Sequence, residues 1–313
     1  MFNLSIIIPH YNSVNSLIAL LNSIPEQEDI QVIVVDDKSN KCAEEYNALK
    51  NKYRHVKFLH NNSDTKGAGV CRNIGLQNAQ GKWLLFADAD DFFVDGFYDR
   101  VTVFFDTQND IVFFSPTSKD NLTGEESDRH LQYKERIQNY IENAGEESVL
   151  YLRYTFYVPW SKMFRHAFIK DNNIFFDETI ASNDVMFSTK SGHYMQTFQV
   201  SDETIYCVTK GIGTLTKTIS ENVFDARVAV YVDYGKFLQK NAPEWAKKTL
   251  GGSRFILIAI TYKLGIKKAV SVYRLFSKNK IPIFSKQDFN LRKTFKKFLT
   301  HIMELKKDKV YFR

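Results

Sequence analysis

Several features that would assign a function class at once are missing from this sequence. Its 313 residues include only three cysteines, Cys42, Cys71 and Cys207, and none has the CxxC spacing of a zinc or redox site. An odd number of widely separated cysteines argues against a disulfide framework and favours a reducing compartment. We therefore expect each cysteine to be a small buried apolar residue.

Targeting and membrane-spanning segments are also missing. The N-terminus, MFNLSIIIPHYNS, lacks the basic segment and apolar run of a secretory signal. Phe255–Tyr262 is the closest approach to an apolar span, and it is far shorter than the roughly 18 residues that a membrane requires. We expect a cytoplasmic protein without a transmembrane helix. Because 44% of the residues are hydrophobic, we also expect a packed globular core.

Charge is distributed unevenly along the chain. The formal net charge is +6, but residues 243–313 hold 18 Lys and Arg against 4 Asp and Glu, a net charge of +14, which leaves −8 for residues 1–242. The helical segment LRKTFKKFLTHIMELKK interleaves cations with apolar residues, which favours contact with an anionic membrane surface. The alternative is a solvated basic face packed on the rest of the protein. Nucleic-acid binding has least support, because no recognition module accompanies the charge.

The first hundred residues alternate between strand and helix patterns. Short apolar, β-branched runs indicate strands buried on both faces, as in a parallel sheet, at Ser5–Ile8, Val32–Val35, Val56–Leu59 and Trp83–Ala87. Helical patterns separate them at Val14–Ile24, Ala43–Tyr53 and Ala68–Ala79. This alternation predicts an α/β fold, a doubly wound, mostly parallel sheet flanked by helices.

The remaining chain is predicted to change character twice. Residues 116–145 are polar and indicate an insertion or mobile loop with some helix, placed after a strand at Ile111–Phe114. A helix at Asp184–Tyr194 precedes two strands, Phe198–Val200 and Thr204–Val208. Beyond about residue 220 we expect only helices: Val223–Gln239, Trp245–Leu264, Lys267–Ser277 and Asp288–Leu305. We therefore expect two regions, one over residues 1–220 and a basic helical extension over residues 221–313.

Polar residues follow three of the four predicted parallel strands, where open sheets bind ligands. These strand ends read Pro9-His10-Tyr11-Asn12, Asp36-Asp37-Lys38-Ser39 and Asp88-Ala89-Asp90-Asp91. The last of them places three carboxylates within four residues, where they repel one another unless a cation is present. Mg²⁺ and Mn²⁺ prefer carboxylate and phosphate oxygens. The alternative is a solvated acidic turn.

Two further motifs suit a nucleotide. A carboxylate at Asp37 can accept hydrogen bonds from a base or ribose, although Asp36-Asp37 with Ser39 also fits an Asx turn. Lys66-Gly67-Ala68-Gly69 precedes a helix that carries Arg72, and helix N-termini favour anions. It matches neither the phosphate-binding loop of nucleotide triphosphatases nor GxGxxG after a first strand.

Taken in order, these segments resemble the family 2 glycosyltransferases of the GT-A fold. The resemblance lies in IIIPHYN, VIVVDDKS and KGAGVCRNIGLQNAQGKWLLFADADD, then in WSKMF at Trp160–Phe164 and FDETIASNDVMF. It covers about residues 3–215. The order of these motifs along the chain carries the resemblance, since no single motif is decisive.

The resemblance implies roles for the matching positions. Pro9, Tyr11 and Asp37 correspond to nucleoside-binding positions, and Lys66 and Arg72 to contacts with the base or diphosphate. Asp88 and Asp90 correspond to the DxD pair that holds Mn²⁺ or Mg²⁺, with Asp90 the direct ligand and Asp91 a close substitute. Asp184 falls where the family has its catalytic base, and Lys210 and Thr214 lie in a late loop that closes over the donor.

A few positions are left with two interpretations. Trp160 would lie under the acceptor or in the core. His10 replaces a small residue and would touch the donor, and His193 would be a third metal ligand or a packing histidine. Asn183 stands where the family usually has Glu, which removes a negative neighbour of Asp184.

The implied function is inverting transfer of a sugar from a nucleotide-diphosphate donor, with uridine the family's usual base, to a hydroxyl of a saccharide or lipid-linked saccharide. A role in surface-polysaccharide synthesis, in the cytoplasm or at the inner membrane face, is the corresponding expectation. Two alternatives remain. A sugar nucleotidyltransferase would need a glycine-rich basic loop where this chain has PHYNS. A catalytically impaired nucleotide-sugar-binding or scaffold protein is supported only by Asn183.

Overall fold

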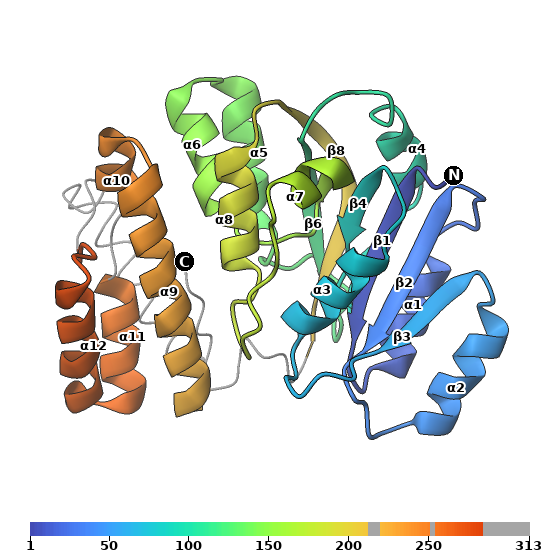
Figure 1. The fold of residues 1–313 in the computed structure, drawn as a ribbon, viewed down its shortest axis with the longest axis horizontal. Coiled ribbons are helices and arrows are strands. Elements are labelled where there is room, and N and C mark those ends of the chain that lie inside the picture. Colours follow the sequence, from blue (N-terminus) through green and yellow to red (C-terminus); the bar gives the residue numbers. More distant parts are fainter. Residues whose placement is uncertain (212–219, 251–253, 284–313) are drawn as a thin grey trace. The chain divides into compact units, whose positions relative to one another are not determined.

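The computed structural model describes residues 1–211, 220–250 and 254–283 (Figure 1). Contacts between residues divide the chain into two compact units, Met1–Gly211 and Ile212–Arg313, and each is described by itself. The functional boundary that we expect at residue 220 stays a prediction. Thr214 and the predicted helix Asp288–Leu305 lie outside the described residues.

Unit 1 is built on one sheet in the order β3-β2-β1-β4-β7-β6-β8-β5. Four parallel strands form one half: β1 (Leu4–His10), β2 (Ile30–Asp36), β3 (Val56–His60) and β4 (Trp83–Phe86). The other half is mixed and contains β5 (Phe92–Phe93), β6 (Ile111–Asp120), β7 (Lys162–Arg165) and β8 (Phe198–Lys210). There β7 runs antiparallel to β4 and β6, β8 runs parallel to β6, and β5 runs antiparallel to β8.

The strand order explains why helices cover both faces of the parallel half. The chain moves outward from β1 to β2 and β3 through α1 (Val14–Asn22) and α2 (Ala43–Lys52), then returns to β4 beside β1 through α3 (Ala68–Asn78). Right-handed crossovers in opposite directions place their helices on opposite faces. Figure 1 shows α3 in front of the strands and α1 behind them. Every residue of β1 and β2 is buried, as the continuous apolar runs predict.

The mixed half departs from the expectation for residues 116–145. The helix expected within this segment is α5 (Leu131–Glu142), but the segment does not begin as a loop, because β6 continues to Asp120. Residues 115–120 are polar in part, but their backbone groups pair with β8 over Ser115↔Thr204 to Asp120↔Lys210. Backbone pairing supplies these hydrogen bonds whatever the side chains are. The same pairing joins the two strands predicted at 198–208 into the single β8, with a register shift near Ser115.

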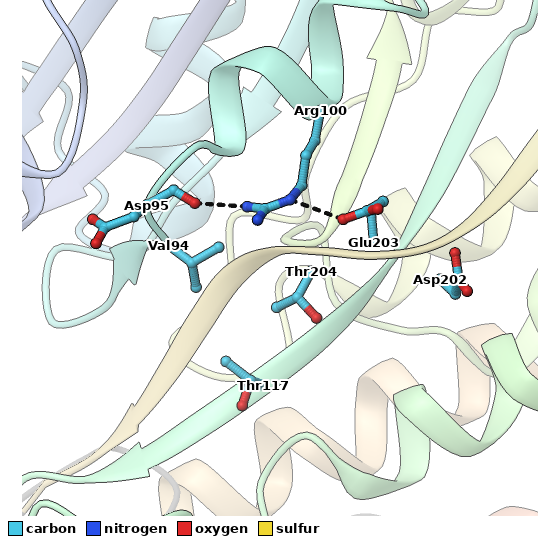
Figure 2. Close-up of a pocket in the computed structure, with 7 residues that line it drawn as sticks. All are labelled: Val94, Asp95, Arg100, Thr117, Asp202, Glu203 and Thr204. Atoms are coloured by element: carbon cyan, nitrogen blue, oxygen red, sulfur yellow. Dashed lines mark hydrogen bonds and ion pairs between the residues drawn. The ribbon is translucent and has the colours of Figure 1, made fainter.

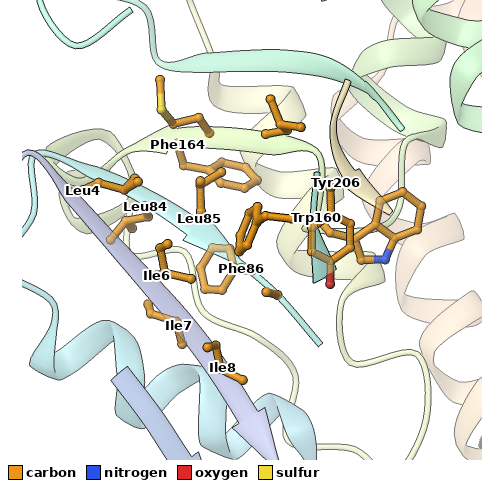
Figure 3. Close-up of a cluster of buried hydrophobic side chains, with 14 of the residues drawn as sticks. Leu4, Ile6, Ile7, Ile8, Leu84, Leu85, Phe86, Trp160, Phe164 and Tyr206 are labelled. Carbon is orange, nitrogen blue, oxygen red and sulfur yellow. The ribbon is translucent and has the colours of Figure 1, made fainter. Parts of the chain in front are cut away.

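An aromatic cluster in the core, of which Figure 3 labels Phe86 and Phe164, fixes the helix that begins after Asp184. The Phe86 ring in β4 meets the ring edges of Phe164, Phe176 and Phe187 at centroid distances of 5.8, 5.0 and 5.4 Å. Phe187 belongs to α8 (Val185–Tyr194) and stacks on Phe176 at 3.9 Å. Burying a phenylalanine side chain contributes about 1.5–3 kcal/mol, so this cluster anchors α8 firmly to β4. Two helices, α6 (Glu146–Thr155) and α7 (His166–Asp171), and the short α4 (Phe97–Thr102) complete unit 1.

Unit 2 is helical, as predicted. It contains α9 (Glu221–Asn241), α10 (Glu244–Leu250), α11 (Arg254–Leu264) and α12 (Ile266–Lys278), and its core includes Phe224, Ile260 and Phe276. The single helix expected over Trp245–Leu264 is wrong, because α10 ends at Leu250 and α11 begins at Arg254. Glycines at 251 and 252, poor helix formers, separate the two in sequence. Among the described residues, no helix is both long and apolar enough to cross a membrane.

Candidate active site

The carboxyl ends of β1, β2 and β4 bring the predicted polar segments to one edge of the sheet. The register pairs His10 of β1 with Asp36 of β2, and Asp36 with His60 of β3. Strand β4 lies on the other side of β1, so the strand order reverses between them. Open α/β sheets bind ligands at such a reversal. The loops that begin at Tyr11, Asp37 and Asp88 all start here.

At one end of this edge, Asp37 is held by two donors. Its Oδ1 accepts from Asn61 Nδ2 at 2.8 Å, and its Oδ2 accepts from the Gly67 backbone N–H at 2.8 Å. Tyr11 is half-exposed, and the Lys66 ammonium lies 4.6 Å from its ring centroid. Tyr11, Asp37 and Lys66 are therefore neighbours, as the resemblance implies. Pro9 lies within the buried strand β1.

Arg72 connects the middle of the edge. Its guanidinium is 5% exposed and donates from Nη2 to Asp88 Oδ1 at 2.5 Å and from Nη1 to Asn183 Oδ1 at 2.6 Å. Asn183 comes close because Gly69, at the start of α3, has no side chain: a Cβ there would lie 2.1 Å from the Asp177 carbonyl oxygen. The segment before α8 thus packs directly on the start of α3. Asn183, the departure from the family pattern, takes part in this contact as a neutral acceptor.

The three carboxylates of the Asp88–Asp91 segment differ in environment. Asp91 is buried and accepts hydrogen bonds on both oxygens, from the Tyr206 hydroxyl at 2.9 Å and the Thr209 backbone N–H at 2.7 Å. Asp88 and Asp90 are only half-buried. Burial raises the pKa of Asp90, and the negative charge of Asp88 raises it further. Asp91 therefore holds the turn in shape, whereas Asp88 and Asp90 border the edge.

The donor chemistry of Asp88 and Asp90 fits a divalent cation. Two half-buried carboxylates that repel each other would be relieved by a bound cation, and phosphate oxygens or water would complete the octahedral shell that Mg²⁺ prefers. Among the described residues, no group of three or more His, Cys, Asp or Glu side chains is arranged to hold a metal ion. Asp88 and Asp90 could therefore supply at most a part of such a shell, and a diphosphate would have to share the ion.

Asp184 stands immediately before α8, and its carboxylate makes no capping hydrogen bond to that helix. This side chain therefore does not cap α8. Burial raises the pKa of Asp184, the charge of Asp88 adds to this, and Arg72 and Lys162 oppose it. A carboxylate with a raised pKa and no capping partner is suited to accept a proton.

Lys162 was overlooked among the candidate residues, although WSKMF contains it. Its side chain is fully buried, with Nζ donating to the Phe156 carbonyl oxygen at 2.9 Å. The ammonium lies 5.1 and 5.4 Å from the ring centroids of Phe156 and Phe164. Burial lowers the pKa of Lys162 well below its usual value, and the charge of Asp184 opposes the shift.

Tyr206 bonds directly to the turn Asp88–Asp91, and Trp160 packs against Tyr206. The Tyr206 hydroxyl accepts from the Asp88 backbone N–H at 2.8 Å and donates to Asp91. Trp160 is 5% exposed, stacks on Tyr206 at 6.0 Å and meets Tyr133 edge-on at 5.0 Å (Figure 3). These contacts are those expected of a tryptophan packed in the core. A contact between Trp160 and an acceptor stays a prediction.

The remaining predicted site residues make other contacts within the protein or lie outside the described residues. Lys210 pairs with Asp128 at 3.5 Å, and Thr214 lies outside the described residues. His10 is buried and bonded to Asp36, so it does not reach the open edge. His193 shares a hydrogen bond of 2.8 Å with the Tyr154 hydroxyl, which agrees with a packing histidine.

Two hollows open in unit 1 away from the carboxylate centre. One of about 590 Å³ is lined by residues around β5, β6 and β8, and in it Arg100 bonds the Asp95 carbonyl oxygen and pairs with Glu203 (Figure 2). None of the predicted site residues lines it. The second, of about 360 Å³, is bordered by Asp36, Tyr46 and His60. Neither of these two hollows is lined by Asp88, Asp90 or Asp184.

Comparison with known proteins gives the family. The family model described as "Glycosyl transferase family 2" matches residues 5–172, more than half of the chain. The chain belongs to glycosyl transferase family 2. The resemblance seen in its motifs is thereby confirmed.

Among curated relatives of this family member is the poly(ribitol-phosphate) beta-N-acetylglucosaminyltransferase TarS of Staphylococcus aureus. It is 29% identical over 224 residues, which cover 68% of this chain and 36% of TarS. The putative glycosyltransferase EpsH of Bacillus subtilis is 23% identical over 249 residues, 76% of this chain and 69% of EpsH. The match thus spans only about a third of the length of TarS.

Solved structures confirm the predicted fold class. The crystal structure of S. aureus TarS 1-349 in complex with UDP-GlcNAc has a TM-score of 0.58 at 21% identity, covering 99% of this chain and 82% of that one. A mannosyltransferase from Pyrobaculum calidifontis in complex with GDP-Man and Mn²⁺ has a TM-score of 0.56 at 13% identity, covering 98% and 84%. The α/β sheet with a helical extension is shared with both.

The Tyr206 contacts predict a stability effect. Tyr206→Phe removes the hydroxyl that both Asp88 and Asp91 use, leaving buried polar groups unpaired, and should lower the free energy of unfolding by about 1–3 kcal/mol. Urea denaturation followed by circular dichroism measures the change. Tyr194→Phe, at a 39% exposed position, is the matched control and should change little. Equal loss in both variants would contradict the support role.

Proposed function

We propose that this chain is a glycosyltransferase that moves a sugar from a uridine-diphosphate sugar to an acceptor hydroxyl, with inversion at the anomeric carbon. The observation that carries the proposal is that Arg72 bonds both Asp88 and Asn183, the neighbour of Asp184, beside the sheet edge where Asp37 also lies, in a family 2 chain. TarS structures in complex with UDP and with UDP-GlcNAc support a uridine donor. Surface-polysaccharide synthesis is the proposed setting, supported by the poly(ribitol-phosphate) relative.

Each part of the site has a proposed task. Tyr11 and Asp37 would bind the nucleoside, and Lys66 and Arg72 would face the diphosphate with positive charge. Asp88 and Asp90 would hold Mn²⁺ or Mg²⁺. When bound, such an ion supplies charge neutralisation on the leaving diphosphate. Lys210 and Thr214 remain proposed contacts of a loop over the donor, and Asp91 keeps the turn in place.

The acceptor side needs one base. Asp184, with a pKa raised by burial, would take the proton of the attacking hydroxyl. A single base and direct displacement invert the configuration, and no carboxylate nucleophile is needed, in contrast to retaining glycosidases. Nothing in the family assignment supports the nucleotidyltransferase alternative. A nucleotide-sugar-binding protein without catalysis is distinguished by the experiments below.

A donor screen tests the proposal directly. Purified protein with Mn²⁺ and a panel of nucleotide-sugars should release nucleoside diphosphate from one uridine donor, and EDTA or Asp90→Ala should reduce the rate by about 100-fold or more, as expected when a charge-stabilising group is lost. Asp95→Ala, at an exposed carboxylate beside β5, is the matched control and should retain activity. Metal-dependent binding without turnover would favour the non-catalytic alternative, and no binding of any donor would refute the proposal.

The base assignment makes a separate prediction. Asp184→Asn should lower kcat by about 10²- to 10⁴-fold with little change in the KM for the donor. Because only the deprotonated carboxylate accepts a proton, wild-type kcat should fall as the pH is lowered through the raised pKa of Asp184. Steady-state kinetics across pH measure both effects. Asp171→Asn, on the surface at the end of α7, is the control, and unchanged turnover of Asp184→Asn would rule out this base.

We also propose peripheral contact of the basic region 243–313 with an anionic membrane that presents a lipid-linked acceptor. Support comes from the net charge of this region and from three exposed cations of α12, Lys267, Arg274 and Lys278. Lys268 is excluded from this set because it pairs with Glu221 and Asp225.

Sedimentation with vesicles tests the membrane contact. Binding should require phosphatidylglycerol, and changing Lys267, Arg274 and Lys278 together to Glu should weaken it by about 1 kcal/mol or more per residue. The matched control changes Lys52, Lys57 and Lys170 to Glu in unit 1, all exposed. Equal weakening by both sets, or equal binding to phosphatidylcholine, would contradict a contact through α12.

A further inference from the structure

A buried histidine joins the two loops that the proposed function assigns to the nucleoside. His10, the last residue of β1, is 1% exposed, and Asp36, the last residue of β2, is 4% exposed. The His10 Nδ1 atom lies 2.8 Å from Asp36 Oδ1. Tyr11 follows His10 directly, and Asp37 follows Asp36. The two buried residues therefore stand immediately behind the two proposed nucleoside contacts.

The hydrogen bonds fix which nitrogen of His10 carries the proton. The backbone N–H of Ser13 donates to Nε2 at 3.2 Å, so Nε2 must be unprotonated. The proton then sits on Nδ1 and is donated to the Asp36 carboxylate. Neutral His10 is thus an acceptor for the loop after β1 and a donor to the end of β2.

Asp36 extends the connection into the second loop. Its Oδ2 accepts from the Ser39 backbone N–H at 3.0 Å, and the Ser39 hydroxyl accepts from the Asn12 backbone N–H at 2.9 Å. The Asp37 backbone N–H donates to the His10 carbonyl oxygen at 2.8 Å. Asn12, in the left-handed region with φ of 50°, is held in place by these bonds. The two loops therefore form one hydrogen-bonded unit with the His10–Asp36 pair at its base.

We propose that His10 is a positioning residue: its neutral imidazole locks the loops after β1 and β2 together and so holds Tyr11 and Asp37 in the arrangement that binds the nucleoside. The proposal rests on the proposed function, because it takes these loops as the nucleoside site. His10 itself lies beneath the site and does not reach a ligand.

Protonation of the His10 ring would remove part of this connection between the two loops. A proton on Nε2 would point at the Ser13 N–H, so two donors would face each other, and the bond from the first loop would be lost. Burial lowers the pKa of His10, opposed by its bond to Asp36, which keeps the ring neutral at neutral pH. The contribution of neutral His10 is complete above about pH 6.5, the unfolded value, and is lost as the pH falls from there through the lowered pKa of His10 in the folded protein.

Other ionisable groups near His10 do not account for such a change. Tyr46 of α2 stacks on the imidazole at 4.8 Å, and burial raises its pKa, so it stays neutral. Burial raises the pKa of the Cys71 thiol of α3 to about 12. Asp36 has a lowered pKa and stays charged. His60 of β3 is half-exposed, lies 3.7 Å from Asp36 Oδ2 and needs its own control; Lys50 of α2 contacts it at 3.2 Å.

The experiment measures binding of UDP-GlcNAc by calorimetry from pH 5.0 to 7.5, because the diphosphate diester does not titrate there. His10→Ala should weaken binding by about tenfold, the loss of one or two net hydrogen bonds, while donor hydrolysis at saturation stays within about threefold of wild type. His10→Asn keeps an amide donor toward Asp36 and should restore part of the affinity. Wild type should bind more weakly as the pH falls through the lowered pKa of His10, and His10→Asn should lose that dependence.

Hydrogen exchange of the ligand-free protein supplies a readout that does not depend on the donor. In His10→Ala, residues 11–13 and 37–41 should exchange faster than in wild type after correction for intrinsic rates. His130→Asn is the structural control, since His130 is also fully buried with a pKa lowered by burial but bonds Ser118 instead. His60→Asn controls for the neighbouring imidazole on Asp36 and should keep the wild-type pH dependence.

The two readouts separate two kinds of failure. If wild type binds no UDP-GlcNAc at any pH, the proposed uridine donor is wrong, while exchange of the two loops still tests the lock. If His10→Ala and wild type exchange these loops equally, or if His10→Asn keeps the full pH dependence of binding, the positioning role of His10 is overturned.

Discussion

The guanidinium of Arg72 is the group on which the rest of the site depends. It is buried, and it bonds to Asp88 at the end of β4 and to Asn183 just before α8. Its positive charge opposes the rise in pKa of both Asp90 and Asp184. At a poorly solvated sheet edge, several carboxylates would otherwise repel one another strongly. One cation therefore sets both the geometry and the charge state of the proposed centre.

Around Arg72, carboxylates that look equivalent in the sequence have different tasks. Asp91 has both oxygens occupied by Tyr206 and Thr209, whereas Asp90 is half-buried at the edge. A similar division holds for the two aspartates after β2, where Asp36 is bonded to His10 and Asp37 to the Gly67 backbone. Within each pair the two neighbouring carboxylates therefore have different hydrogen-bond partners, although Asp37, like Asp91, is bonded on both oxygens.

The parallel half of the fold could be predicted because its signals are local. Continuous β-branched runs such as Val32–Val35 occur only where both faces of a strand are buried, and the strand ends then locate the edge. The mixed half could not be predicted in this way. The second part of β6 is polar, and it forms a strand because it pairs with β8, some 90 residues away in the sequence. Lys162 was missed for a related reason. Lysine is almost never fully buried, so nothing in the sequence indicates a lysine surrounded by Phe113, Phe156 and Phe164.

The bond from Thr209 to Asp91 spans 118 residues of sequence. At about 5–20 residues per second, a ribosome needs roughly 6–24 s to synthesise that interval, and the strand must also leave the exit tunnel before it can pair. Until then the parallel half can form, but the turn with its three carboxylates has no partner in β8. A nascent or truncated chain that ends before residue 206 would therefore have the nucleoside end of the site without a stable acidic turn. Such long-range closure also raises the contact order, so we expect completion of the acidic turn to be a late and slow event in folding.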